Sequence, residues 1–356
     1  MIVEELIKRI ENAEPIREVS CAGGQYAGAN FASGIFESVD FTGADLRGTS
    51  LAEAVFINCI FDGAMLNDAN FVKASFADGS AKNASVLGGK LVGTKFANID
   101  FSGSNFAKSV HHLSAMVGCS LLACNFSDAA FEQASIVNCK TAGIIIIGVS
   151  LHRTSFIGAD FRTCDFTDTK FFRSSLLDSD FSSRSLAGLN VSACLLKGSN
   201  FSKANLEGGK FQQCMLIEAN LEGAIGRGVN FSRAVFSGAK LNGAVLPNCN
   251  FVEAIFVGAE AAGANFSRSD FSRCAATGLK ASDTDFSGCS FERTDFSHAI
   301  LDRANFIGAQ FNKTNLHAIS EQDIIMPNRN GTLRTDPERD RAERWHDIDL
   351  EKSYGG

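Results

Sequence analysis

A large hydrophobic residue returns at every fifth position through most of this chain. Of the 58 positions taken every fifth residue from Phe31 to Leu316, 30 are Phe and 16 are Leu, and the register never slips. Thirty of the 31 phenylalanines lie in this column, and only Phe172 lies outside it. A period of five fits neither an α-helix, at about 3.6 residues per turn, nor a β-strand, at about two. The pattern therefore predicts a tandem-repeat architecture.

A second column, two residues before each central residue, is restricted to small side chains. It holds mainly Ala, Ser, Thr, Gly and Cys, as in Ala44, Thr49 and Cys59. The residues between the two columns are mostly Asn, Asp, Ser, Lys and Gly, which favour turns and surfaces. Together the two columns resemble the pentapeptide-repeat family, whose consensus is A(D/N)LXX, and the resemblance covers residues 20–316.

The resemblance implies an all-β solenoid, in the form of a right-handed quadrilateral β-helix. Four pentapeptides would make one square coil, with the central and the small residue both pointing inward. At four units per coil, the 58 units make about 14–15 coils, each stabilised by its neighbours. We expect an N-terminal capping helix in residues 1–19, the β-helix in 20–316, and a charged tail with a short helix in 317–356.

Both ends of such a β-helix need covers, because open strand edges invite polymerisation. Apolar residues at 2, 3, 6, 7 and 10 recur at helical spacing and predict an amphipathic helix over the first coil, with dimerisation as its alternative role. In the tail, Asp336 before Pro337 is typical of an N-cap and first turn, which predicts a helix to about Ile348. This helix carries the single tryptophan, Trp345, which we expect to pack on the last coil or to contact a partner.

Ten of the 11 cysteines lie in the small inward column, and Cys21 lies in the central column. No Cys-x-x-Cys pair is present, so we expect small, buried, reduced thiols, with neither disulfides nor a bound metal. Two other inward residues are unusual. His111 is a central residue, and Arg184 occupies the small column, where its charge must be paired or reach solvent and should distort the coil nearby.

We find no sequence signature of catalysis. The six histidines lack the spacing of a metal or nucleophile site, and the chain has no phosphate-binding glycine loop after a strand. The aspartates before central residues, such as Asp40, Asp160 and Asp270, have the position of a solvated surface. We therefore expect a non-enzymatic protein with no cofactor and no small-molecule substrate.

The charge distribution bears on one role of the family, whose acidic members mimic DNA and bind type II topoisomerases such as gyrase. The net charge is −7, but residues 1–18 carry −2 and residues 317–356 carry −3, which leaves −2 for the repeats. Mimicry needs dense negative charge. Gyrase modulation is therefore the alternative to a scaffold function, as is a role as a secretion-system accessory or effector protein.

The sequence also bears on location and on other partners. We see neither a membrane span nor an export signal and expect a cytoplasmic bacterial protein, with signal-peptide-independent secretion as the other route. We expect no direct nucleic-acid binding.

One of the four expected faces is unusually apolar. Stacking of residues 20 apart gathers central residues 36, 56, 76 and every twentieth residue to 316 on one side, which we call the Phe36 face. Of its 30 outward sites next to central residues, 13 hold Ile, Val, Leu or Met, against three to seven on each other face. Such a stripe indicates an interaction surface, although strands also favour β-branched residues.

We therefore predict a scaffold or adaptor whose Phe36 face binds a protein partner or a second copy of the chain, as in a homodimer. The predicted contact residues are Ile157, Leu177, Leu195, Met215, Ile217, Val235, Ile255 and Val257. Ile145, Ile147 and Trp345 are secondary candidates.

Overall fold

The computed structural model describes residues 1–343, which form parallel β-coils between a short N-terminal helix and a short C-terminal helix. Each coil takes 20 residues, since the N–H of a central residue donates to the carbonyl 19 residues later, as from Phe31 to Ser50 (2.8 Å). The chain is a parallel β-solenoid of about 16 turns, which confirms the predicted fold class. It has more turns than the Phe/Leu column predicts because pairing begins at Ile16 and continues to Leu333.

The pentapeptide is a short extended segment followed by a tight turn. Gly34 N–H donates to the carbonyl of the central Phe31 (3.1 Å) and closes the turn, and Ser33 at the corner has a φ of 60°. A positive φ at the third position of a turn favours Gly, Asn and Asp, which recur at these corners. The central and small residues of each unit point inward, and nearly all are buried.

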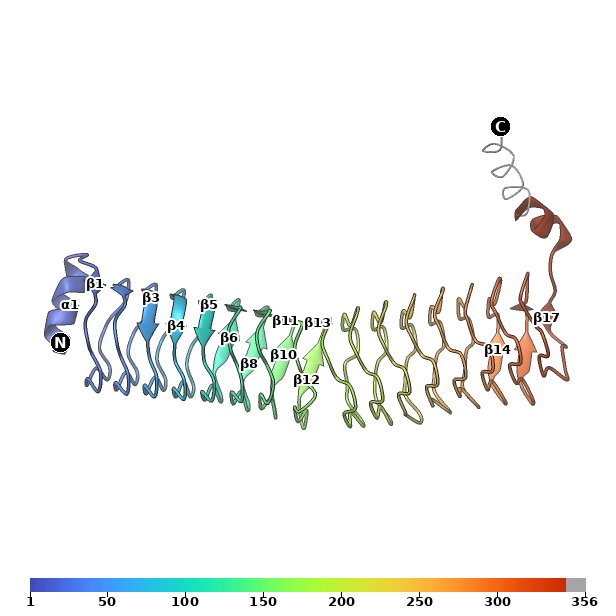
Figure 1. Cartoon of the computed structure of the whole chain (residues 1–356), viewed down its shortest axis with the longest axis horizontal. Helices are drawn as coiled ribbons and strands as arrows, with labels where there is room; N and C mark the ends of the chain where they lie inside the picture. Colours follow the sequence, from blue (N-terminus) through green and yellow to red (C-terminus); the bar gives the residue numbers. More distant parts are fainter. Residues whose placement is uncertain (344–356) are drawn as a thin grey trace, which may run out of the picture. The chain divides into compact units, whose positions relative to one another are not determined.

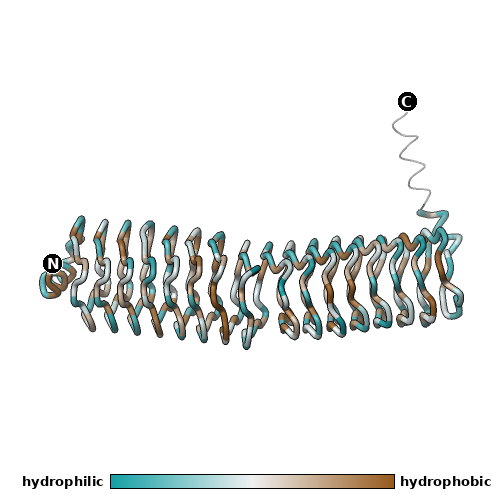
Figure 2. Tube along the Cα trace, turned by 60° about the horizontal axis from the view of Figure 1, so that its bottom comes forward, coloured by the Kyte–Doolittle hydropathy of each residue, from teal (hydrophilic) through white to brown (hydrophobic). Residues whose placement is uncertain are grey.

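The coils form two compact units. Unit 1 contains residues 1–184 and 190–200, and unit 2 contains residues 185–189 and those from 201 onward. Figure 1 shows the coils stacked along each unit. In Figure 2, hydrophobic segments recur from coil to coil.

Unit 1 begins with helix α1 (Val3–Glu11), which covers the first coil as predicted. Leu6 is fully buried, and the Tyr26 hydroxyl donates to the carbonyl of Met1 (2.9 Å). On the Phe36 face, nine strands pair in parallel in the order β1-β2-β3-β4-β5-β7-β9-β11-β13. They are β1 (Ile16–Arg17), β2 (Ile35–Glu37), β3 (Val55–Ile60), β4 (Ser75–Ser80), β5 (Lys95–Asp100), β7 (Ala115–Val117), β9 (Ser135–Val137), β11 (Ser155–Ile157) and β13 (Ser175–Leu177).

A second sheet of unit 1, in the order β12-β10-β8-β6, lies on the face of central residues 31, 51, 71 and every twentieth residue onward, which we call the Phe31 face. Its strands are β6 (Val110–His112), β8 (Ala130–Glu132), β10 (Ser150–His152) and β12 (Lys170–Phe172). His111 lies in register in β6, so its coil is regular at this point.

Unit 2 is held mainly by isolated parallel bridges at the same 20-residue register, such as Met215 with Val235. Its described strands are β14 (Ser290–Glu292), β15 (Gln310–Asn312), β16 (Thr314–Asn315) and β17 (Thr332–Leu333). Residues 337–343 are helical, and Asp336 Oδ1 accepts the N–H groups of Glu338 and Arg339, which confirms the predicted N-cap. The remainder of the predicted helix, with Trp345, lies outside the described residues.

Stacked phenylalanine rings fill the core of each unit. In unit 1 the ring centroids of Phe36 and Phe56 are 4.7 Å apart, and those of Phe56 and Phe76 are 4.6 Å apart. Each such buried side chain stabilises the fold by roughly 1.5–3 kcal/mol. Where Ala81 and Val86 replace larger central residues, an apolar cavity of about 20 Å³ remains, which is too small for an organic ligand.

All 11 cysteines are free and buried. Burial raises the pKa of the Cys59 and Cys194 thiols to about 11, so these thiols stay protonated at neutral pH. Many inward thiols and hydroxyls also donate to the carbonyl 23 residues earlier, as Cys124 does to Phe101 (3.0 Å) and Thr94 does to Phe71 (2.8 Å). The small column therefore supplies hydrogen-bond donors as well as space, a role that the sequence analysis missed.

Arg184 distorts its part of unit 1, as expected for a cation in the small column. Its Nη2 donates to the carbonyl of Cys164 (2.6 Å), while its buried Nε has no hydrogen-bond partner among the described residues. The central Phe166 is only half-buried, and Asp165 lies outside any β-bridge. The Arg184 guanidinium thus keeps one strong hydrogen bond, and Phe166 is less completely packed than the other central phenylalanines nearby.

Candidate interaction surface

In unit 1, the predicted contact residues lie outward on the Phe36 face. Ile157 and Leu177 are paired in register at the ends of β11 and β13, and Leu195 follows through a bridge to Ser175. Leu195 is 41% exposed, whereas Ile157 and Leu177 are half-buried because neighbouring coils cover their flanks. The ladder also includes Val137, which pairs with Ile157.

In unit 2, a second ladder follows the bridges from Met215 to Val235 and from Val235 to Ile255. Met215 is 39% exposed, Ile255 is 36% exposed and Val257 is 44% exposed. Ile217 and Val235 are half-buried between them. Each unit therefore presents stacked aliphatic side chains on this face.

Strand propensity alone does not account for these aliphatic residues. In unit 1 the preference of strands for β-branched residues is enough to explain them, because the Phe36 face there is the nine-stranded sheet. The coils of unit 2 from 215 to 257 contain isolated bridges in place of strands, and yet they keep Ile255 and Val257 exposed. Met215, at the same face, is not a β-branched residue. Exposed aliphatic side chains therefore continue along this face in both units.

The secondary candidates are isolated from this surface. Ile145 and Ile147 are exposed, but they flank a central residue of the face of residues 46, 66, 86 and so on, which we call the Leu46 face. The corresponding residues of the adjacent coils at the position of Ile145 are polar, Asn125 and Asp165. The third candidate, Trp345, lies outside the described residues.

The aspartates before central residues serve the backbone as well as facing solvent. Asp40 Oδ1 accepts the N–H of Thr42 (2.8 Å), and Asp165 Oδ1 accepts both the hydroxyl (2.6 Å) and the N–H (2.9 Å) of Thr167. The two bonds from Thr167 lower the pKa of Asp165. The same contact recurs at Asp160 and Asp270, so these carboxylates are local structural caps of the kind found in Asx turns.

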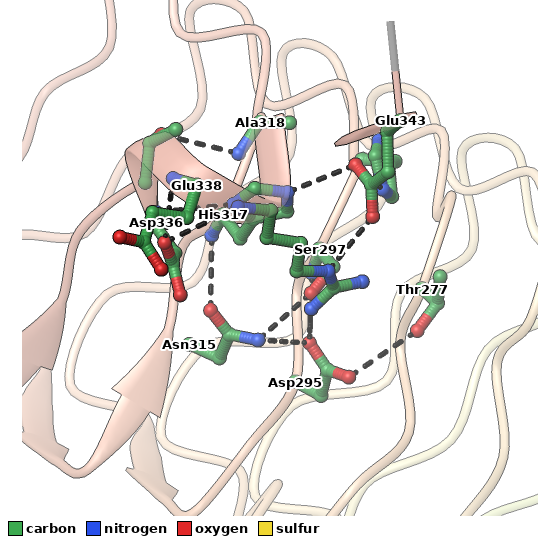
Figure 3. A network of polar contacts seen from close by, with 12 residues as sticks. Thr277, Asp295, Ser297, Asn315, His317, Ala318, Asp336, Glu338 and Glu343 are labelled. Carbon is green, nitrogen blue, oxygen red and sulfur yellow. Dashed lines mark hydrogen bonds and ion pairs between the residues drawn. The ribbon is translucent and has the colours of Figure 1, made fainter. Parts of the chain in front are cut away.

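A cluster at the C-terminal end has the donor types of a metal site (Figure 3). His317 Nε2 lies 3.0 Å from Glu343 Oε2. His298 Nε2 lies 3.3 Å from the same oxygen. However, His317 Nδ1 accepts the N–H of Asp336 (3.2 Å), so in the neutral ring the proton is on Nε2 and is donated to Glu343.

A metal-bound histidine normally donates its other N–H to an acceptor, whereas Nδ1 of His317 faces a donor. The cluster therefore fits a clasp that fastens the helix at 337–343 to the last coil, and it does not fit a metal centre. Hydrogen bonds from His317 and Arg339 lower the pKa of Glu343 to about 2, which keeps this carboxylate ionised in the clasp.

His111 is enclosed in the core of unit 1. Its ring is fully buried and stacks on Phe131 at 4.2 Å, and its Nε2 lies 2.8 Å from the Ser109 hydroxyl. Burial lowers the pKa of His111 from 6.5 to about 3. This imidazole is neutral at physiological pH and has no access to a substrate.

Two models of known protein families match the repeat region of the chain. One family model, described as a pentapeptide repeat region, matches residues 29–106. A second, described as pentapeptide repeats (8 copies), matches 144–182, 174–213, 210–243, 234–273 and 282–317. The chain belongs to the pentapeptide-repeat family. Both models describe a repeat, and the chain is a pentapeptide-repeat scaffold.

Solved pentapeptide-repeat proteins are distantly similar. Full-length QnrB1, a plasmid-mediated fluoroquinolone resistance protein, is 17% identical over 52% of this chain and 92% of its own, with a TM-score of 0.42. HetL, involved in heterocyst differentiation regulation in the cyanobacterium Nostoc sp. strain PCC 7120, is 19% identical over 81% of this chain and 96% of its own, with a TM-score of 0.20. None of the curated proteins compared with the chain matches it. Within residues 1–343, no helix has the length and apolarity to cross a bilayer.

Proposed function

We propose that this pentapeptide-repeat protein is a non-catalytic scaffold that binds a protein partner through its Phe36 face. The observation that carries the proposal is the exposed aliphatic ladder of unit 2, formed by Met215, Ile255 and Val257, which continues where the coils have single bridge residues in place of full strands. Each of these side chains leaves more than a third of its surface in water. Covering one of them contributes on the order of 1 kcal/mol to binding.

The charge of the repeats favours this function over DNA mimicry. Duplex DNA carries one negative charge per about 1.7 Å, which corresponds to roughly three charges per coil at a strand spacing of about 4.8 Å. The repeat region has a net charge of only −2. Several of its aspartates are also paired locally, as Asp45 is with Arg47 (2.7 Å). Gyrase modulation remains the second candidate, and it predicts binding that weakens steeply with salt.

The test compares two sets of substitutions on different faces of the same unit. The first is Met215→Lys with Ile255→Lys and Val257→Lys. The matched control is Ile225→Lys with Val245→Lys and Ile307→Lys on the Leu46 face, where the native side chains are 49%, 43% and 55% exposed. Partners captured by cross-linking in a host lysate would be purified and titrated against wild type and both variants. Thermal unfolding would verify that each variant is folded.

The proposal expects loss of at least tenfold in partner affinity for the Phe36-face variant and little change for the control. Self-association of the purified wild type that disappears in the same variant would identify the partner as a second copy. Equal binding by the two variants, or a partner lost only in the Leu46-face control, would contradict the proposal. Gyrase binding that both variants retain would favour the second candidate.

A further inference from the structure

The Phe31 face is the only face of unit 1 with a net positive charge. Its outward and corner sites hold five basic residues, Lys73, Lys90, Arg153, Lys170 and Arg173, and two acidic residues, Glu53 and Glu132. Counted in the same way, each of the other three faces of unit 1 has more acidic than basic residues. One side of unit 1 is therefore cationic, although the whole chain is acidic.

Two arginines of this face lie at the same corner of adjacent coils, with no acidic residue at that corner between them. Arg153 and Arg173 occupy the same corner in adjacent coils, where the Arg153 N–H donates to the Phe172 carbonyl (2.9 Å). Like charges directly opposite each other destabilise a sheet. Within residues 1–343, no carboxylate forms an ion pair with Arg153, Arg173 or the nearby Lys170.

At the same corner of the Phe31 face in unit 2, the arginines form ion pairs with a glutamate. Glu253 lies between two arginines there, at 2.7 Å from Arg233 and 3.5 Å from Arg273. Lys73 and Glu53 form a similar pair in unit 1, at 3.4 Å. The unneutralised arginine pair at 153 and 173 therefore departs from the pattern that this chain uses elsewhere.

Phe172, the only phenylalanine outside the central column, lies beside this pair and is 49% exposed. The His152 ring covers one side of it, with centroids 4.9 Å apart and planes at 3°. The Arg173 guanidinium lies over the Phe172 ring, 5.3 Å from its centroid. Glu132 braces His152, at 3.7 Å from its Nδ1, and also approaches His112 at 3.5 Å. These contacts hold the Phe172 ring in place in the absence of a ligand.

We propose that Phe172, Arg153, Arg173 and Lys170 form a second docking site, which binds an acidic segment of a partner protein. Carboxylates of the segment would neutralise the two arginines, which present planar, charge-assisted donors to them. An apolar side chain of the same segment would cover the exposed part of Phe172. Exposed aromatic and arginine residues are the types that dominate binding energy at protein interfaces.

The geometry favours a peptide over a single-stranded nucleic acid. Nucleobases bind such surfaces by stacking on free aromatic faces. The Phe172 ring already has His152 stacked on it and the Arg173 guanidinium over it, so less of its face is free for a base.

The test uses fluorescence anisotropy at low salt with two probes. One is a fluorescein-labelled peptide that repeats Glu-Glu-Leu-Glu-Glu twice, and the other is a labelled deoxythymidine decamer. The variant is Arg153→Glu, which would recreate the Glu–Arg ladder seen at Arg233 and Glu253. The control, Arg293→Glu, makes the same charge change at the same corner of unit 2, next to Arg273.

The site predicts that Arg153→Glu weakens peptide binding about tenfold, since it removes one attraction and adds one repulsion. Arg293→Glu should change the affinity less than twofold. Phe172→Ala should weaken peptide binding while leaving the fold intact. Failure of the wild type to bind the peptide, an equal loss in the control, or tighter binding of the deoxythymidine decamer would overturn the proposal.

Discussion

At the residue scale, the pentapeptide forms a stable coil because nearly every polar group within it has a hydrogen-bond partner. Inward Ser, Thr and Cys side chains donate to carbonyls of the preceding coil, as Thr94 does to Phe71. Outward Asp and Asn side chains accept the N–H of the residue after the central one, as Asp40 does from Thr42. Buried backbone groups must be paired, so these side chains are part of the fold.

The buried His111 predicts how stability depends on pH. Its folded pKa of about 3 lies below the unfolded value of 6.5, so the unfolded chain binds a proton between these values and the folded chain does not. Stability from this group is complete above pH 6.5 and falls by about 1.4 kcal/mol per pH unit as the pH drops toward 3. His111→Phe should remove this contribution, as measured by denaturant unfolding at several pH values. Parallel pH profiles for wild type and variant would show that His111 is not protonated on unfolding.

We expect the folded protein to resist thiol reagents, because its cysteines are buried. Burial holds the pKa of Cys59 and Cys194 near 11, so almost no thiolate exists at pH 8. All 11 thiols should react with an aromatic disulfide reagent only after denaturation. Rapid labelling of any thiol in the native protein would contradict the burial described for that position.

At the element scale, α1 and the first coil form a local cap. Leu6 is buried at the first coil, and the Tyr26 hydroxyl donates to the Met1 carbonyl, which joins the start of the chain to the Leu46 face. Because each coil contacts only its neighbours, the effect of damaging this cap should stay near it.

Leu6→Ala should therefore cost about 2–5 kcal/mol of local stability. Hydrogen exchange should accelerate at amides of the first coils, such as Tyr26, whose N–H donates to Asp45 (2.7 Å). Amides of unit 2 should keep their protection. An equal acceleration in both units would mean that the solenoid unfolds as one cooperative block.

Most of the elements could be predicted from the sequence because one side-chain period controls them. The coil, the inward columns, α1 and the N-cap at Asp336 all follow from residue spacing. The clasp of His317 and Glu343 could not be predicted, since it depends on how a non-repetitive tail folds back. The stack of His152 on Phe172 could have been predicted, because residues 20 apart are neighbours on a face.

At the scale of the whole molecule, the repeat makes each face an independent surface. Residues 20 apart share a face, so apolar residues gather on the Phe36 face and unpaired cations on the Phe31 face of unit 1 without disturbing the core. The total charge of −7 hides this separation, which is why composition alone did not reveal the cationic site. A four-sided scaffold of this kind can present different chemistry to different partners.

The central claim is that the Phe36 face is the surface that contacts a partner, and site-specific photo-cross-linking tests it most directly. A photoreactive amino acid would be placed at Met215 in one protein and at Ile225 in another, because these exposed positions lie on different faces of unit 2. The account predicts a discrete cross-linked product from position 215 in host cells, and little or none from position 225. Equal products from both positions, or a product from position 225 alone, would contradict it.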